Sequence, residues 1–173
     1  MAVGRGKEFE NVIRKAFERV DGVSIDRLND NTAGFKGIAG ICDFIVYKYP
    51  YEFYFECKAV HGNTLSINSN DTKHKYGNIS NNQWEGLLEK SKIDGVFAGV
   101  ICWWVDKDIT MYLPIEFLVH AKEMGFKSVP SDLFSKWILD SYDKIPEVIP
   151  GKKKRVFFDY NMQLFLFRLS GSR

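Results

Sequence analysis

Several features that would assign a protein class are missing from this chain of 173 residues. It has no apolar run of about 18 residues that would span a membrane, and no apolar secretory segment at its start. Repeats and low-complexity segments are absent, and a net charge of +2 is too small to indicate a nucleic-acid partner by itself. We therefore expect a soluble cytoplasmic protein with no membrane partner, nucleoid-associated in a cell or in the host cytoplasm if a virus encodes it.

Cysteine and histidine are scarce and scattered. The three cysteines, Cys42, Cys57 and Cys102, stand in apolar segments without the paired spacing of a zinc site or a disulfide framework. They predict buried thiols in a reducing compartment. His120 falls in an apolar helical pattern, where a packed side chain is commoner than a ligand. A mechanism built on a histidine-activated nucleophile is therefore disfavoured.

The composition suits one compact enzyme. Apolar residues make up 45% of the chain and aromatic residues 15%, which is ample for a core. We expect a single domain over residues 1–173, with a flexible basic arm at 1–7. The segment 145–173 is expected to be a C-terminal extension whose aromatic residues pack on the domain or on a partner subunit.

Two segments, 41–48 and 53–60, are rich in β-branched and aromatic residues and predict paired strands. A two-residue turn centred near Pro50 would place Asp43 opposite residue 56 or 58 of an antiparallel partner. Residues on opposite strands share a face, so Asp43 and Glu56 would converge. Their Cβ atoms would then lie roughly 5 to 8 Å apart, a span that one hard cation can bridge with oxygen ligands.

Lys58 follows Glu56 by two residues and therefore points to the same face of its strand. Uncompensated charges in so apolar a strand cost several kcal/mol each, so these groups require a partner. Magnesium or manganese is the natural one. The alternative is that they are charges of an edge strand, which discourage aggregation between sheets.

A first helix is predicted from about Gly6 to Val20, because its apolar residues recur at helical spacing. Glu10 lies near the border of the apolar stripe and Glu18 points almost opposite to it, so only Glu8 and Glu10 would face a neighbouring metal site. Alternatively, both are acids of the first turn that the helix dipole favours.

The remaining elements predict an α/β scaffold. Ser80-Asn81-Asn82-Gln83 has the form of a capping box that starts a helix, and 96–105 predicts a central strand buried on both faces. Trp103 and Trp104 would point to opposite faces and pack in the core. A neighbouring strand at 109–113 and two helices, one after Pro114 and one after Ser131, complete a mixed sheet flanked by helices.

Taken together, Gly6-Lys7-Glu8-Phe9-Glu10, Asp43, Glu56-Cys57-Lys58 and Asn82-Gln83-Trp84 resemble the PD-(D/E)xK nucleases. Within that superfamily the chain looks most like the RecU-type Holliday junction resolvases, and it is also similar to the Hjc type. The resemblance covers about residues 4 to 118 and implies a restriction-endonuclease-like fold with an αβββαβ core. Two departures stand out: Cys42 replaces the proline of the superfamily's name, and 29–40 is short for the stalk of RecU-type proteins.

The resemblance implies a site and its chemistry. Asp43, Glu56 and the backbone carbonyl of Cys57 would hold one or two Mg²⁺ or Mn²⁺ ions, with Glu10 completing the shell. Lys58 would orient the water or stabilise the transition state, and two neighbouring carboxylates favour its charged form over a role as proton acceptor.

Gln83 has two expected roles. By resemblance it would help to orient the attacking water, whereas the capping box would have its side chain return a hydrogen bond to Ser80. We expect that one rotamer cannot satisfy both. The implied catalytic residues are Glu10, Asp43, Glu56, Lys58 and Gln83.

The implied activity is that of a crossover junction endodeoxyribonuclease, which hydrolyses phosphodiesters of a four-way (Holliday) junction to leave 5′ phosphates. The basic residues suited to DNA phosphates are Arg5, Lys7, Lys36, Lys73, Lys75, Lys152, Lys153, Lys154 and Arg155. Symmetric cutting of two strands calls for two sites related by a dyad, which predicts a homodimer. The alternatives are a nuclease of this superfamily acting on other DNA, and a junction-binding protein without hydrolysis.

Overall fold

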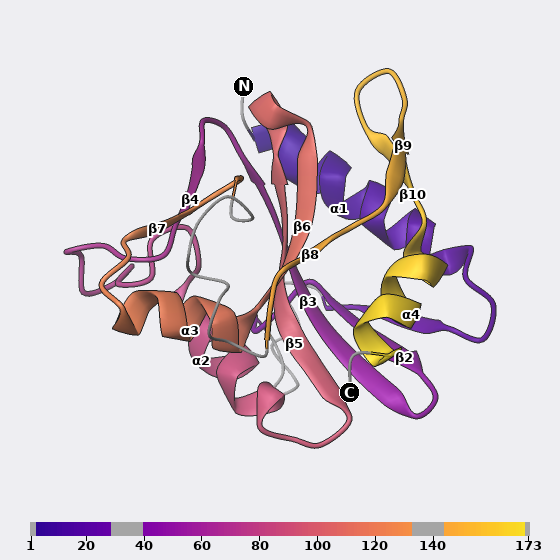
Figure 1. Cartoon of the computed structure of the whole chain (residues 1–173), viewed down its shortest axis with the longest axis horizontal. Helices are drawn as coiled ribbons and strands as arrows, with labels where there is room; N and C mark the ends of the chain where they lie inside the picture. Colours follow the sequence, from indigo (N-terminus) through magenta and orange to yellow (C-terminus); the bar gives the residue numbers. More distant parts are fainter. Residues whose placement is uncertain (1–2, 29–39, 133–143, 172–173) are drawn as a thin grey trace.

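The computed structural model describes residues 3–28, 40–132 and 144–171, and its centre is a mixed six-stranded sheet (Figure 1). The strands lie in the order β1-β2-β3-β5-β6-β8. Their bounds are β1 Ser24–Arg27, β2 Phe44–Lys48, β3 Tyr51–Val60, β5 Val96–Trp104, β6 Ile109–Pro114 and β8 Glu147–Val148. Only β3 and β5 pair in parallel; the other neighbours in this sheet are antiparallel.

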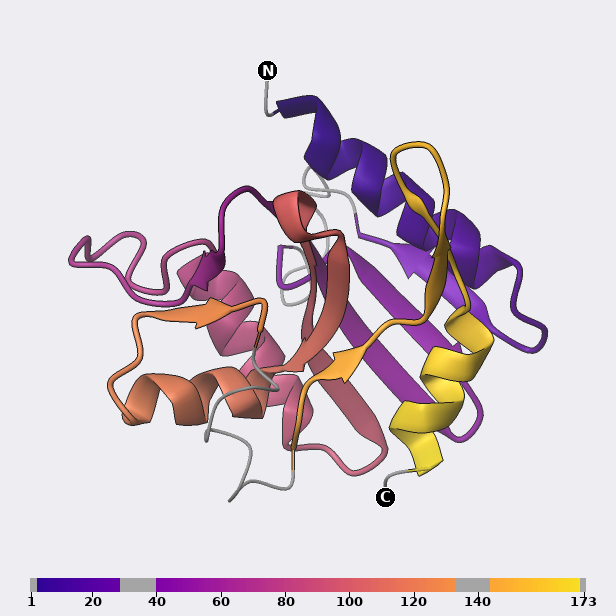
Figure 2. The ribbon, with the colours of Figure 1, turned by 45° about the horizontal axis from the view of Figure 1, so that its top comes forward.

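Helices cover both faces of the sheet (Figures 1 and 2). One face carries α1 (Val3–Glu18) and α4 (Met162–Gly171), and the other carries α2 (Asn81–Ser91) and α3 (Ile115–Glu123). The smaller elements are the 3-10 helix η1 (Val105–Lys107) and two strand pairs, β4 (Thr64–Ser66) with β7 (Ser128–Pro130) and β9 (Gly151–Lys153) with β10 (Phe158–Tyr160). Apart from the short β4, the order α1-β1-β2-β3-α2-β5 is the expected αβββαβ core.

Each face of the sheet has its own hydrophobic core. On the α1 side, the helical stripe predicted from the sequence is buried, and Phe17 stacks on Phe55 of β3 with ring centroids 5.5 Å apart. Phe165 of α4 packs against the same Phe55 at 5.9 Å. The C-terminal aromatic segment therefore contributes directly to this core.

Strand β5 is buried along its whole length, as expected for a central strand. Trp103 belongs to the core under α1, and Trp104 belongs to the core under α2 and α3. The prediction that both tryptophans pack in the core, on opposite faces, is confirmed.

The hairpin between β2 and β3 has the predicted two-residue turn, Tyr49-Pro50, with a cis peptide bond. Its register pairs Phe44 with Phe55. Asp43 lies one residue before this ladder, and its N–H bonds to the carbonyl of Phe55 instead of pairing with Glu56. The two acids are therefore close, but the ladder does not set them directly opposite each other.

Some expectations at the ends of elements were wrong. The first helix begins at Val3 and ends at Glu18, so Arg5 and Lys7 are helical residues and do not belong to a basic arm. Strand β1 was not located from the sequence, because it is a four-residue edge strand with three exposed residues. The helix expected after Ser131 and the position of Lys36 lie outside the described residues.

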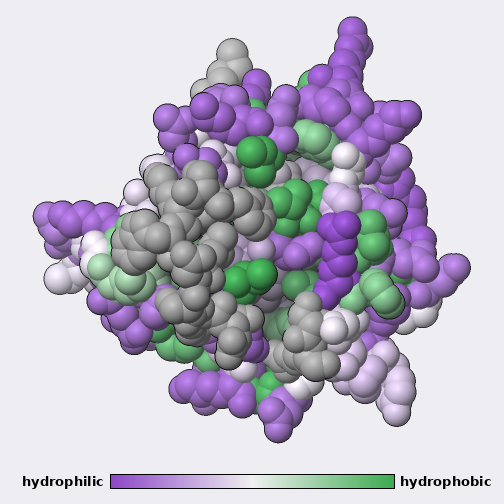
Figure 3. Space-filling model, in the orientation of Figure 1, coloured by the Kyte–Doolittle hydropathy of each residue, from purple (hydrophilic) through white to green (hydrophobic). Residues whose placement is uncertain are grey.

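Within the described ranges, no helix combines the length and hydrophobicity needed to cross a membrane. The surface that Figure 3 shows carries a projecting hydrophilic hairpin made by β9 and β10, which lies beside α1 in Figures 1 and 2. Residues 151–155 of this hairpin are exposed.

Candidate active site

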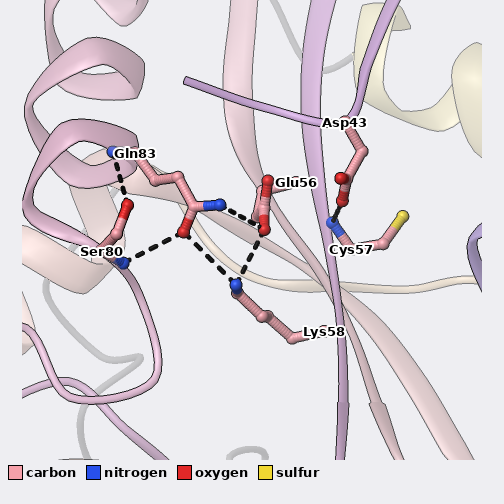
Figure 4. Close-up of polar contacts among 6 residues, drawn as sticks. All are labelled: Asp43, Glu56, Cys57, Lys58, Ser80 and Gln83. Carbon is pink, nitrogen blue, oxygen red and sulfur yellow. Dashed lines mark hydrogen bonds and ion pairs between the residues drawn. The ribbon is translucent and has the colours of Figure 1, made fainter. Parts of the chain in front are cut away.

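Asp43 lies directly before β2 and is fixed by hydrogen bonds to β3 and to Leu28, the residue that follows β1. Its backbone N–H donates to the carbonyl of Phe55 (3.1 Å), and its carbonyl accepts from the N–H of Leu28 (2.9 Å). Its carboxylate accepts from the backbone N–H of Cys57 at 2.7 Å (Figure 4). These three bonds hold the Asp43 side chain beside the middle of β3.

Glu56 is buried in β3, with 3% of its surface exposed. The ammonium of Lys58 lies 2.8 Å from Glu56 Oε1, and the side-chain amide nitrogen of Gln83 donates to the same oxygen at 2.6 Å. Among the described residues, the other carboxylate oxygen, Oε2, is buried with no hydrogen-bond partner. A buried acceptor in this state is costly, so Oε2 marks a place for a group that the described residues do not supply.

The environment disfavours the charged form of Glu56. Burial, reinforced by the negative charge of Asp43, raises the pKa of Glu56 from 4.5 to about 8, although Lys58 acts in the opposite direction. A bound cation would favour the carboxylate form, as an opposite charge close to an acid does.

Gln83, in the first turn of α2, connects this helix to the strand (Figure 4). Its amide oxygen accepts from the backbone N–H of Ser80 (3.0 Å) and from Lys58 Nζ (3.3 Å), while its amide nitrogen donates to Glu56. The capping box is thus complete, since Ser80 Oγ also accepts from the Gln83 N–H. One rotamer of Gln83 thus serves both the cap and Glu56, because the two ends of its amide bond to them separately.

Glu10 is held away from a direct role in this network. Its carboxylate forms an ion pair with Arg27 of β1 at 3.0 Å, a partner that the sequence analysis missed together with β1. Glu10 lies close enough to Glu56 to contribute to its raised pKa. In the part of the chain that the structure describes, no three His, Cys, Asp or Glu side chains are grouped to hold a metal. The structure therefore brings Asp43 and Glu56 together but does not add Glu10 to a three-carboxylate cluster.

The donor set nevertheless fits a hard divalent cation. The carboxylates of Asp43 and Glu56 offer oxygen ligands, and Glu56 Oε2 is buried without a hydrogen bond from the residues that the structure describes. Magnesium and manganese prefer oxygen ligands, and magnesium commonly binds through one or two carboxylates while keeping several waters.

Cys57 would contribute only its main chain to such a site. Its thiol belongs to the core on the α1 side, where burial raises the pKa of Cys57 well above its usual value. Cys42 and Cys102 are likewise buried, and all three thiols are free. The predicted buried thiols are confirmed.

The basic residues proposed for DNA contacts lie on three separate elements. Arg5 and Lys7 are in α1, Lys73 and Lys75 are in the loop before α2, and residues 152–155 are in the β9–β10 hairpin. Two of these positions form surface ion pairs: Lys75 with Glu85 at 3.0 Å, and Lys153 with Asp108. Because these elements are separate, the positions of the basic residues along the chain do not by themselves define one continuous DNA-binding surface.

Comparison with known proteins adds little. No family model and no curated protein matches the chain. One similar solved structure is that of Hjc from Archaeoglobus fulgidus, described as a Holliday junction resolvase from an archaeal hyperthermophile. It is 16% identical, with a TM-score of 0.44, over 66% of this chain and 75% of that one. A likeness at this level carries no argument about function.

Proposed function

We propose that this chain is a magnesium-dependent endodeoxyribonuclease that cuts four-way DNA junctions. The observation that supports a metal-dependent nuclease is Glu56, close to Asp43 and paired with the Lys58 ammonium, whose buried Oε2 has no hydrogen-bond partner among the described residues. A lysine at this position has a use in phosphodiester hydrolysis, where negative charge develops on the phosphoryl oxygens. The junction as substrate rests on the resemblance of the motifs to the RecU-type and Hjc-type resolvases.

The residues divide the work of the reaction. Asp43, Glu56 and the main-chain carbonyl of Cys57 would hold the cation, which when bound activates a water and offsets charge on the phosphate. Lys58, 22% exposed and paired with Glu56, presents its ammonium to the developing charge. Gln83 donates a hydrogen bond to Oε1 of Glu56 and so leaves Oε2 available for the cation.

A four-way junction is two-fold symmetric, so paired cuts require two active sites related by a dyad. The proposal therefore includes a homodimer. Glu10, 19% exposed on its side chain and paired with Arg27, is proposed to complete the shell of the metal site only after that ion pair opens.

The test is cleavage of a labelled four-way junction beside a matched linear duplex, with Mg²⁺, by the native chain and by Asp43→Asn. Asparagine keeps an oxygen that can accept from the Cys57 N–H but removes the charge. We expect paired symmetric nicks on the junction, and a loss of more than about a hundredfold in Asp43→Asn, since charge stabilisation by a metal contributes several kcal/mol.

Asp26→Asn is the matched control, because Asp26 is an exposed acid of β1. It should cut like the native chain. Equal cutting of junction and duplex would replace junction resolution by a general nuclease activity. Tight junction binding with no cleavage in Mg²⁺ or Mn²⁺ would contradict the enzyme and identify a DNA-binding protein.

A further inference from the structure

The side-chain amide of Gln83 takes part both in the cap of α2 and in the hydrogen bonds around Glu56. Its oxygen belongs to the cap of α2 through Ser80, and it also accepts from Lys58. Its nitrogen donates a hydrogen bond to the carboxyl group of Glu56. A residue that controls this amide therefore controls one of the donors to Glu56.

The partners of Gln83 fix the direction of its amide. The Ser80 N–H and the Lys58 ammonium are donors only, so they require the amide oxygen, and the NH₂ group is left to face the carboxylate. The terminal torsion of glutamine is broad by itself. A rotation by half a turn would set the NH₂ group against both donors, and these two contacts are repulsive.

Ser80 is held in a fixed place. Next to it in the chain, Ile79 is fully buried, and Asn78 accepts from the backbone N–H of Ser66 at 2.8 Å. Tyr76 stacks on Trp84 of α2 with ring centroids 4.4 Å apart and planes 3° from parallel. The cap thus starts from a segment that is attached both to β4 and to the helix that it caps.

We infer that Ser80 is a positioning residue for the active site: through Gln83, it directs a hydrogen bond onto Glu56 Oε1 and leaves Oε2 for the cation. Its Oγ holds the backbone of Gln83, and its N–H holds the amide oxygen. The kinetic part of this inference rests on the proposed nuclease function, whereas the structural part does not.

The experiment compares Ser80→Ala, Ser80→Thr and the matched control Asn161→Ala. Asn161 caps α4, where its side-chain oxygen accepts from the N–H of Leu164 at 3.0 Å, and like Ser80 it is exposed. The first readout is the side-chain NH₂ signal of Gln83 in the ¹⁵N spectrum of the metal-free protein, assigned by its loss in Gln83→Glu. The second is kcat and KM for junction cleavage in Mg²⁺, measured well below the unfolding temperature.

Ser80→Ala keeps the N–H of residue 80 but removes the Oγ that holds the Gln83 backbone, so the Gln83 NH₂ signal should shift away from its native position, and kcat should fall about tenfold with KM nearly unchanged. Threonine also caps helices, so Ser80→Thr should restore both readouts. Asn161→Ala should lose stability but leave both readouts native.

If Ser80→Ala is destabilised like Asn161→Ala while the Gln83 signal and kcat stay native, Ser80 only caps the helix and the inference is overturned. Should Ser80→Ala fail to fold, Ser80→Gly takes its place, since glycine is tolerated at N-caps nearly as well as serine. A native protein that cuts no DNA would refute the proposed function alone, because the NH₂ signal still decides the position of Gln83.

Discussion

The carboxyl group of Glu56 lies in an apolar sheet, with donors on one oxygen and none on the other among the described residues. In the absence of a cation, this arrangement favours the protonated acid. The free energy of unfolding should therefore depend on the charge state of this one side chain.

We predict the sign of that dependence. The pKa of Glu56 is about 8 in the folded chain, against 4.5 for an ordinary glutamate. Between these values the folded state holds a proton that the unfolded state has released, so the metal-free protein loses stability as pH rises through this window and no further above it. One pKa unit corresponds to about 1.4 kcal/mol, so the loss amounts to a few kcal/mol.

Glu56→Gln removes the ionisation and keeps the shape of the side chain. Its stability advantage over the native chain, measured by denaturant unfolding in EDTA, should grow from pH 5 to pH 8. Glu89→Gln, which removes an exposed carboxylate of α2, controls for the lost charge. Stability curves for Glu56→Gln and native protein that run parallel across this range would contradict the raised pKa.

At the scale of the element, a small residue of α2 lets this helix pack closely on the segment that leads to Asp43. A Cβ atom added at Gly86 would lie 2.3 Å from Ile41 Cγ2 and 2.7 Å from Ile41 Cβ. Ile41 is buried two residues before Asp43. The close approach at Gly86 therefore sets the distance of both Gln83 and Asp43 from β3.

Gly86→Ala is predicted to destabilise the protein. Alanine is the better helix former by about 1 kcal/mol, but overpacking of a filled core costs about 1–3 kcal/mol, and Ile41 must move. Thermal and denaturant unfolding should both report the loss, and cleavage should fall as well. Gly6→Ala in α1 is the control, because a Cβ there meets nothing within 4 Å, so it should gain stability. A Gly86→Ala protein more stable than native would show that α2 can move without cost.

The sequence predicted part of this arrangement, and the particular residues show why. Turn length and alternation sufficed to predict the hairpin that brings Asp43 near Glu56, since both are local properties of one hairpin. The contact of Gln83 with Glu56 spans 27 residues and depends on how closely α2 approaches the sheet, which Gly86 decides. The pairing of Glu10 with Arg27 was missed because β1 has too few buried residues to show a pattern.

At the scale of the molecule, the exposed aromatic residues bear on the proposed homodimer. Phe167 of α4 is 70% exposed, although its neighbours Phe165 and Leu166 are buried. Tyr49 in the β2–β3 turn is 83% exposed. Exposed aromatic side chains are typical of protein contacts.

Light scattering should give twice the chain mass of 20.0 kDa at micromolar concentration. Phe167→Asp should shift the protein towards monomer, since a charge opposes burial at an interface. Ile93→Asp, at another exposed apolar residue (51%), should leave the mass unchanged. A native protein that is monomeric under these conditions would argue strongly against symmetric junction cutting.

The shared use of Gln83 also bears on how the sequence can drift. Replacing Glu56 removes a buried charge and should stabilise the metal-free fold, whereas replacing Gln83 removes both a donor to the acid and an acceptor of the helix cap. If selection for activity were relaxed, Glu56 would therefore be replaced by mutation before Gln83. A descendant without activity is expected to keep glutamine or glutamate at position 83 long after the carboxylate at 56 has been lost.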